Sequence, residues 1–382
     1  MKEIMLTLDK LDDWIVKNKF KGFDPYDIWG GKFTSAILRC GSFIISGGKP
    51  KLFCKITRGA IYLGDMIAPN LLRSLFGINR EINPKALALL LKSYLNLYKV
   101  TGKEKYQRYA KHLFQLIYET KNDEYGGYGW GYPFNWQFLT FIPRGTPSAV
   151  VTSFVVDSLI DYYSLFKDSK VLTLFDGIYK FLTHSLNIST SDNNSICFSY
   201  TPLDKSHVIN VTALVSKALI QIGQLMGYQH AVTLAEKAVN YVVDNQLESG
   251  GFYYYGREEP LLGNIDHYHN VYIYLSLKKV NDILHNPNLS KAIKKWESFY
   301  LREFFIDDMP CYTPGNIYPI DSHTLANALI ALSELKKDYY IEKRLDRIIE
   351  FLYKNFMDRK KGTFYYKVER IGPVKLINPF HI

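Results

Sequence analysis

Apolar residues recur every three to four positions over most of the chain, which is the spacing of side chains on one face of an α-helix. The clearest stretch begins at Asn83-Pro84, where proline is tolerated in the first helical turn, and ends at Thr101-Gly102. A return helix over residues 106–120 follows it. The same plan predicts further helix pairs at 150–166 with 171–186, 208–226 with 231–246, 268–284 with 289–304, and 324–335 with 341–356.

A short run of aromatic residues and glycines follows each of these pairs before the next one begins. The runs occupy residues 126–132, 197–200, 250–255, 309–312 and 362–366. A recurrence of this kind, with a period of roughly 50 to 70 residues, predicts a repeat architecture. Each run leads into the loop that opens the next pair, so we expect these loops to lie together at one end of the molecule.

The repeat predicts an all-α protein, an (α/α) toroid or barrel of about six helix pairs with short aromatic-rich hairpins or loops at one end. A helix is expected over residues 3–18, and residues 3–80 are expected to supply the sixth pair. We therefore predict one domain over residues 1–382, in which residues 1–80 are a basic, less regular part that completes the toroid. Strand–helix alternation and glycine-rich phosphate motifs are absent, which disfavours nucleotide-binding α/β folds.

The composition favours a soluble protein with a pocket for polar rings. Hydrophobic residues make up 47% and charged residues 22% of the chain, and 30 tyrosines raise the aromatic share to 15%. Tyrosine combines a large apolar face with a hydroxyl, which suits sugar binding, although tyrosines also fill helix interfaces. No apolar run approaches the ~20 residues of a membrane span, and no secretion signal opens the chain, so a cytoplasmic location is predicted.

The four cysteines are scattered and show neither a CxxC pair nor a zinc-type spacing. We expect Cys40, Cys54, Cys197 and Cys311 to be reduced, small apolar residues in a reducing compartment.

The net charge of +10 is concentrated in residues 31–80, which contain eight Lys or Arg and one acid, Asp65. The segment is also apolar, as at residues 43–45 and 61–63. Basic and apolar residues together suggest peripheral contact with an anionic membrane surface, and the alternative is a solvated basic face. Nucleic acid is disfavoured as a partner because no recognition motif accompanies the charge.

The loops that open the pairs hold the candidate catalytic residues. An aspartate can orient a histidine and raise its basicity, and three of these loops combine both residue types. The candidates are His269, Asp266, Tyr268, His207, Asp321, His323 and Tyr200. As an alternative, Asp266 and Asp321 could cap helices, and an isolated histidine could be structural.

The same loops supply candidate substrate-binding residues. An arginine binds carboxylates in two-pronged fashion, and indole rings stack on sugar faces. The candidates are Arg144, Trp130, Trp136, Tyr132, Gln137, Asn210, Tyr255 and Glu258.

A metal site is not predicted, and no cofactor is predicted. The acids and histidines near residues 266–269 and 321–323 lack a known ligand spacing. On a helix, His267 and His269 would point apart. The chain has no GxSxG motif, which disfavours acyl transfer by a serine nucleophile. It also lacks the DxDD motif of terpene cyclases.

Several blocks resemble a family of α/α-toroid proteins encoded in polysaccharide-biosynthesis gene clusters. They are Phe23-Asp24-Pro25-Tyr26-Asp27, Asn83-Pro84-Lys85-Ala86-Leu87-Ala88-Leu89, Gly129-Trp130-Gly131-Tyr132-Pro133-Phe134-Asn135-Trp136-Gln137, Asp266-His267-Tyr268-His269 and Tyr318-Pro319-Ile320-Asp321-Ser322-His323. The resemblance implies a toroid that works on glycans. Thr146-Pro147-Ser148 and Tyr268-His269 also resemble, over a shorter length, the helical domain of glucuronyl C5-epimerases.

We therefore expect an enzyme of polysaccharide biosynthesis that removes the C5 proton of a uronic-acid-containing glycan, as an epimerase or a lyase does. Arg144 would bind the carboxylate, His269 or His207 would be the base, and Tyr268 or Tyr200 the proton donor. A polysaccharide or oligosaccharide, free or lipid-linked, would be the partner.

Two alternatives remain open. A glycoside hydrolase would use two carboxyls, ~5–5.5 Å or ~6.5–9.5 Å apart, from among Asp266, Asp321 and Glu258. The other alternative is a non-catalytic glycan-binding or scaffold protein of an assembly complex.

Overall fold

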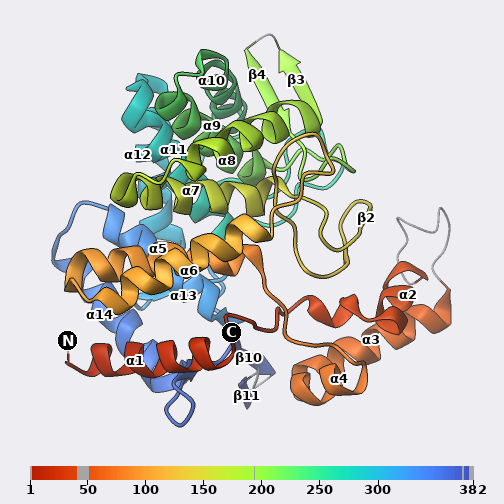
Figure 1. Ribbon diagram of the computed structural model, residues 1–382. Coiled ribbons are helices and arrows are strands. Elements are labelled where there is room, and N and C mark those ends of the chain that lie inside the picture. Colours follow the sequence, from red (N-terminus) through yellow and green to blue (C-terminus); the bar gives the residue numbers. More distant parts are fainter. Residues whose placement is uncertain (1, 41–50, 193, 372–373, 378–382) are drawn as a thin grey trace.

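The computed structural model describes residues 2–40, 51–192, 194–371 and 374–377 (Figure 1). Five helix pairs within this part of the chain form two layers. The inner helices follow one another as neighbours in the order α5 (Pro84–Thr101), α7 (Ala149–Phe166), α9 (Ile209–Met226), α11 (His267–Leu284) and α13 (Ser322–Glu334). Their return partners are α6 (Glu104–Glu119), α8 (Lys170–Lys180), α10 (Gln229–Asp244), α12 (Pro287–Glu303) and α14 (Tyr339–Phe351). Two short π-helical segments, Phe181–Ser185 and Leu352–Phe356, extend α8 and α14.

The inner helices α7 and α9 are apolar around most of their circumference, as expected for helices buried on several sides. By length and composition alone, α7 and α9 could each cross a membrane, which the sequence pattern did not lead us to expect. In the protein 56% of the residues of α7 and 83% of those of α9 are buried against other parts of the chain.

Local sequence signals set the ends of the inner helices. Asn83 caps α5 by accepting a hydrogen bond from the backbone N–H of Lys85 at 3.0 Å, and Pro84 occupies the first helical position. Gly102 ends α5 in the left-handed conformation at φ 66°. Ser148 caps α7 in the same way, by accepting from the N–H of Val151.

The aromatic runs join each repeat to the preceding inner helix. In each of four repeats, a tyrosine carbonyl accepts the hydrogen bond of the first N–H of that helix, at 2.8 to 3.2 Å. The pairs are Tyr200 with Ala149, Tyr254 with Ile209, Tyr312 with His267, and Tyr366 with Ser322. In α5 the first position is Pro84, which has no N–H to offer. Because all these bonds are at helix N-termini, the runs lie at one end of the inner layer.

Short antiparallel hairpins accompany these connections. They pair β1 (Trp136–Gln137) with β2 (Phe141–Ile142), β3 (Ile188–Asp192) with β4 (Ser195–Phe198), β5 (Phe305–Ile306) with β6 (Met309–Pro310), and β8 (Met357–Asp358) with β9 (Thr363–Phe364). A three-stranded sheet has the order β11 (Val374–Ile377), β10 (Lys367–Ile371), β7 (Ile320–Asp321). Its β7 strand leads directly into α13.

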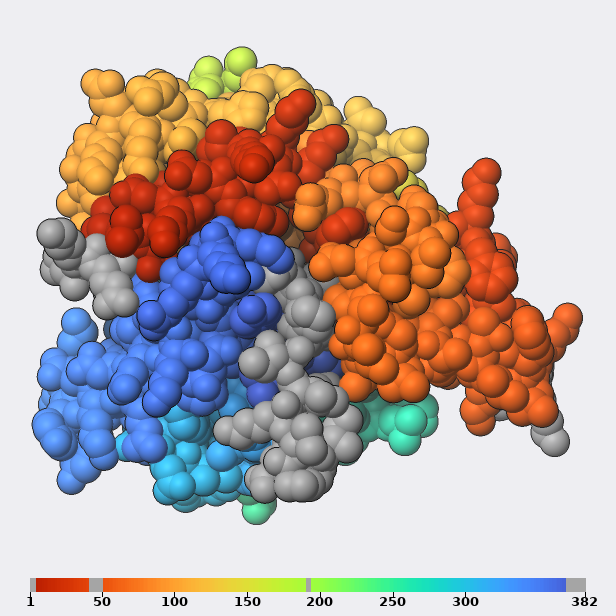
Figure 2. Space-filling model, turned by 90° about the horizontal axis from the view of Figure 1, so that it is seen from below, coloured from red at the N-terminus to blue at the C-terminus, as the bar shows by residue number. Residues whose placement is uncertain are grey.

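The N-terminal part divides into two. Helix α1 (Lys2–Lys17) lies along α6, where the ammonium of Lys105 bonds to Asp9 at 2.6 Å and to Asp12 at 3.1 Å. The described residues of α2 (Lys32–Cys40), α3 (Leu52–Ile67) and α4 (Pro69–Leu75) form a projection that we call the lobe (Figures 1 and 2). The lobe has a small core of its own, beside a short 3-10 turn (Asp27–Gly30). It supplies no inner helix, which differs from the sixth pair expected of residues 3–80.

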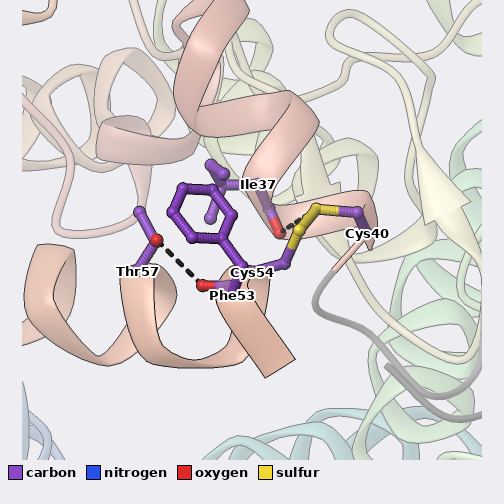
Figure 3. Close-up of a disulfide and its surroundings, with 5 residues drawn as sticks. All are labelled: Ile37, Cys40, Phe53, Cys54 and Thr57. Carbon is purple, nitrogen blue, oxygen red and sulfur yellow. Dashed lines mark hydrogen bonds between the residues drawn. A yellow bond between two sulfur atoms is a disulfide. The ribbon is translucent and has the colours of Figure 1, made fainter. Parts of the chain in front are cut away.

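A disulfide joins Cys40, at the end of α2, to Cys54, in the first turn of α3 (Figure 3). The expectation that all four cysteines are reduced is therefore wrong for this pair, whereas Cys197 and Cys311 are free and buried. The two Cα atoms are 5.9 Å apart although 14 positions separate the residues in sequence. Sequence spacing could not show this pairing, because it depends on how α3 packs against α2.

Candidate active site

A cavity of about 820 Å³ opens among the N-termini of the inner helices. Each aromatic run contributes one tyrosine to its wall. These are Tyr132, Tyr200, Tyr254, Tyr312 and Tyr366. Burial raises the pKa of all five, so their hydroxyls stay protonated and can donate hydrogen bonds to a ligand. A concave, largely apolar cavity with a few polar groups is typical of a small-molecule or saccharide site.

The second residue of every inner helix also lines this cavity. These residues are Lys85, Val150, Asn210, Tyr268 and His323. The shared register follows from the repeat, because the same helical position faces the same way in each pair. The residue type at this position in each repeat therefore decides which functional groups line the cavity.

Asp266 and His269 form the most clearly directed pair. Asp266 caps α11 with one carboxylate oxygen, which accepts from the backbone N–H of His269 at 3.0 Å. Its other oxygen is 2.7 Å from Nδ1 of His269. The ring of His269 lines the cavity, and no hydrogen bond to its Nε2 is found among the described residues. With Nδ1–H donated to the buried carboxylate, Nε2 is left as a proton acceptor facing the cavity.

His323 plays a different part from His269. Its ring stacks on Tyr268 with the centroids 4.4 Å apart, and its Nε2 is hydrogen-bonded to the hydroxyl of Tyr272. Burial, with a smaller contribution from the charge of Lys85, lowers its pKa well below the usual range. His323 is therefore neutral, and with Tyr268 it forms a rigid part of the wall.

Lys85 and Asp24 bring opposite charges to the cavity, and the loop-based candidates did not include them. The Lys85 ammonium lies 4.8 Å from the ring centre of Phe154 and 5.5 Å from that of Tyr272. Burial lowers the pKa of Lys85 to about 8, and the charge of Asp24 opposes this. Asp24 accepts from the amide of Asn83 at 2.9 Å, and burial raises the pKa of its carboxyl. The position after the predicted helix start at Pro84 is the signal that could have identified Lys85.

Polar side chains between the tyrosines complete the wall. Trp136 lies 5.1 Å, ring centre to ring centre, from Tyr200. Gln137 Oε1, Asn210 Oδ1 and Ser322 Oγ are buried and have no hydrogen-bond partner within the described structure. Buried polar atoms are normally paired, so three unpaired ones around one cavity are typical of a place where a ligand supplies the partners.

The structure brings most of the predicted site residues together and separates two binding candidates from them. Trp130 is fully buried in the helical core, and its Nε1 donates to the carbonyl of Ile117 at 2.8 Å. The expected stacking of Trp130 on a sugar is therefore wrong. Arg144 is exposed, lies 3.5 Å from Glu81 and borders a smaller cavity of about 540 Å³. Its predicted contact with a substrate carboxylate beside His269 is not supported by this position.

Three further candidates lie outside the cavity wall. His207 bonds through Nδ1 to Glu259 at 3.0 Å and does not line the cavity. Glu258 is exposed and accepts from the hydroxyl of Tyr241 at 2.7 Å. Tyr255 follows Tyr254 but does not line the cavity. None of the three therefore shares the cavity wall with His269.

Some candidate residues also have the structural roles, as helix caps or core histidines, that the sequence left open. Asp321 caps α13 by accepting from the N–H of Thr324 at 2.6 Å, and burial raises its pKa. His267 points into the core, bonded to the carbonyl of Cys311 and the hydroxyl of Tyr300, with a pKa lowered to about 4. It therefore faces away from His269, as the helical spacing predicted. Over the described ranges, no group of three or more His, Cys, Asp or Glu could hold a metal ion.

The chain matches no family model, and no curated protein resembles it in sequence. Solved structures resemble it in fold. A cellobiose 2-epimerase from Bacillus thermoamylovorans matches with a TM-score of 0.60 at 14% identity, over 78% of this chain and 83% of that one. An α-1,6-mannanase from Salegentibacter sp. gives 0.56 at 13%, over 78% and 86%. A polysaccharide lyase gives 0.51 at 13%, over 78% and 83%. These likenesses confirm the predicted α/α-toroid fold, and at such identities they show the fold alone.

Proposed function

We propose that this protein is a carbohydrate-active enzyme that abstracts a proton from a sugar carbon next to a carbonyl or carboxyl group. The observation that carries the proposal is the Asp266–His269 pair, whose free ring nitrogen faces a tyrosine-lined cavity. A histidine oriented by a buried carboxylate is a typical general base.

The structural neighbours favour a saccharide as the ligand. Their names include sugar epimerases, a mannose isomerase, a mannanase and a polysaccharide lyase. An inactive variant of the mannanase has also been solved in complex with α-1,6-mannotetrose. Epimerases, isomerases and lyases for sugars can all begin by removing a proton next to a carbonyl or carboxyl carbon, which is the step that the His269 geometry suits.

For the substrate we propose a uronic-acid-containing glycan, with C5 as the reacting carbon. His269 Nε2 takes the C5 proton, and the electron pair of the C–H bond passes into the neighbouring carboxylate. Lys85 lies on the same cavity wall and replaces Arg144 as the cation for this developing charge. In an epimerase a tyrosine hydroxyl, from Tyr268 or Tyr200, then returns a proton to the opposite face of C5. In a lyase the electron pair instead expels the oxygen substituent at C4 and leaves a C4–C5 double bond.

The biological setting is proposed on the residue blocks alone. Their likeness to toroid proteins of polysaccharide gene clusters favours a role in polysaccharide assembly, on a free or lipid-linked glycan. A cytoplasmic location stays a prediction. The Cys40–Cys54 disulfide opposes it, because disulfides are typical of oxidising compartments.

The test is incubation with uronate polymers in deuterated water. Deuterium at C5 with a changed epimer ratio indicates an epimerase, and new ultraviolet absorbance from the double bond indicates a lyase. His269→Gln should abolish either signal, whereas His207→Gln, on a neighbouring loop outside the cavity wall, should leave it. The absence of deuterium and of unsaturation with every uronate polymer would refute the substrate assignment. Deuterium at C2 of a reducing sugar would support His269 as the base but show that the reacting carbon is C2 and not C5.

A hydrolase is the second candidate because of two carboxyls in the same cavity. Asp24 and Asp321 both line it, and burial raises the pKa of each. A carboxyl whose pKa is raised by burial holds its proton more readily, which suits the general acid of a glycosidase. New reducing ends without unsaturation, lost in Asp24→Asn but kept in His269→Gln, would favour this reading. Saccharide binding without turnover, retained in both variants, would indicate the non-catalytic alternative.

A further inference from the structure

Helix α3 carries apolar side chains on two opposite faces. One face, with Cys54 and Ile61, packs into the small core of the lobe. The other face points to solvent and carries Leu52, Ile56, Leu63 and Ile67, which are 73, 64, 55 and 67% exposed. Their spacing of four, seven and four residues forms one continuous stripe along the helix. We call these four residues the outer stripe.

Helix α4 exposes apolar residues as well. Leu71 and Leu75, one turn apart on α4, are 60 and 70% exposed. A water-soluble helix normally shows polar residues opposite its buried face, and a helix apolar on both faces is normally covered on both. Exposed apolar residues grouped along neighbouring helices in this way indicate an interaction site.

The charge around the outer stripe has one sign. Lys51, the residue before α3, and Lys55 on α3 lie beside the stripe in sequence and are exposed, and Lys32 and Arg39 on α2 are exposed too. The acid among the described residues of the lobe, Asp65, is half-buried and paired with Arg73. Lys49 and residues 43–45, which the sequence pattern also suggested for a membrane contact, lie outside the described residues.

We propose that the lobe binds the surface of an anionic membrane, with α3 lying in the interface and the outer stripe among the acyl chains. Apolar residues flanked by Lys and Arg suit the boundary between acyl chains and anionic headgroups. The 16 residues of α3 are fewer than the ~20 that a membrane span needs, so the helix lies on the bilayer and does not cross it.

The charge also argues against a second copy of the chain as the occupant. A symmetric contact through the outer stripe would place Lys51 and Lys55 beside their own copies, with no exposed acid among the described lobe residues to pair with them. An anionic bilayer supplies the opposite charge that a second copy lacks.

The lobe also borders the candidate active site. Leu38 of α2 and Trp29 of the adjoining 3-10 turn line the main cavity. Figure 2 shows the lobe projecting beyond the body of the toroid, so it can reach a flat surface. Membrane contact there would hold the cavity close to the bilayer. The inference does not depend on which reaction the cavity performs.

Flotation of the full-length, disulfide-bonded protein with lipid vesicles tests the proposal. We expect at least about tenfold tighter binding to phosphatidylcholine vesicles with about 30% phosphatidylserine than to phosphatidylcholine alone. Binding should weaken when NaCl is raised from about 0.05 to about 0.5 M. Leu63→Glu/Ile67→Glu should lower the affinity at least about tenfold, and Lys51→Glu/Lys55→Glu should remove the preference for anionic lipid.

Val100→Glu is the matched control. Val100 is a lone apolar residue, 85% exposed, at the far end of α5 from the cavity, so its variant should float like the wild type. All the substituted residues are exposed, so thermal denaturation should confirm that each variant is folded. Equal binding to neutral and anionic vesicles, or wild-type binding by Leu63→Glu/Ile67→Glu, would overturn the proposal. A dimer in sedimentation that the same double variant dissociates would overturn it in favour of a second copy.

Discussion

Replacing Asp266 with asparagine separates its role as a helix cap from its role in orienting His269. Asp266 uses both carboxylate oxygens as acceptors, one for the backbone N–H of His269 and one for Nδ1 of the same residue. An amide has a single acceptor oxygen and a donor NH2. Asp266→Asn can therefore keep the helix cap only by turning its NH2 toward Nδ1. Nδ1 must then accept, and the proton of the neutral ring moves to Nε2, where the base is needed.

The geometry sets the size of both effects. Asparagine is as good a cap as aspartate, so the free energy of unfolding should change by less than about 1 kcal/mol. Loss of a general base costs typically about 10²–10⁴-fold in rate, and kcat of the Asp266→Asn variant should fall in that range. If the amide turned the other way, the base would be kept but the cap lost, at about 1 kcal/mol. One orientation therefore lowers activity and keeps stability, and the other lowers stability and keeps activity.

The assay is C5 deuterium exchange together with thermal denaturation of the same samples. Asp338→Asn is the matched control, because Asp338 caps α14 through the N–H of Ile341 at 2.9 Å and has no histidine at that position. It should leave kcat unchanged. An Asp266→Asn variant with both wild-type kcat and wild-type melting temperature would refute the orienting role of Asp266.

Three further predictions follow from burial and bonding. Lys85→Met should lower activity but raise the free energy of unfolding below pH 8 by at most about 3 kcal/mol, because the variant no longer buries a charge. The pKa of Lys85 is about 8 in the folded protein and about 10.4 in the unfolded chain, so this gain in stability should fade between pH 8 and 10.4 in thermal melts. Trp130→Phe should lower the free energy of unfolding by about 2 kcal/mol and leave the saccharide affinity unchanged. Trp136→Ala should weaken saccharide binding about tenfold in calorimetry and leave the stability unchanged. The reverse pattern would contradict our placement of the two rings. Thiol titration of the denatured, unreduced protein should detect two free thiols among the four cysteines, and four free thiols would exclude the disulfide. Cys40→Ser/Cys54→Ser should destabilise the lobe by up to about 3 kcal/mol, measured by limited proteolysis.

Much of the fold was predictable because its signals are local. The start at Pro84 and the end at Thr101-Gly102 match α5 in the structure, and the other toroid helices fall within a few residues of their predicted bounds. Such signals depend only on neighbours in sequence. The lobe depends instead on how α2, α3 and α4 pack, so a basic, apolar segment could not show whether it closes the ring or stands beside it.

The candidate site was predictable where a residue sits in a loop that opens a repeat. His269 and Tyr200 were found in this way, and they line the cavity. Trp130 shares a run with Tyr132, but its side chain points to the core, and the direction of a side chain within a loop has no sequence period. Lys85 was missed because it stands inside a helix, where a lysine is usually a solvated residue.

The tyrosine carbonyls explain why the fold and the cavity are inseparable. The backbone of Tyr200, Tyr254, Tyr312 or Tyr366 satisfies the first N–H of the preceding inner helix, while the side chain of the same residue lines the cavity. Any residue could supply the carbonyl, so repeat closure alone does not require tyrosine. The recurrence of a phenol at each of these positions is therefore better explained by what the cavity binds than by how the repeats join. That argument favours a polar, ring-shaped ligand independently of the Asp266–His269 pair.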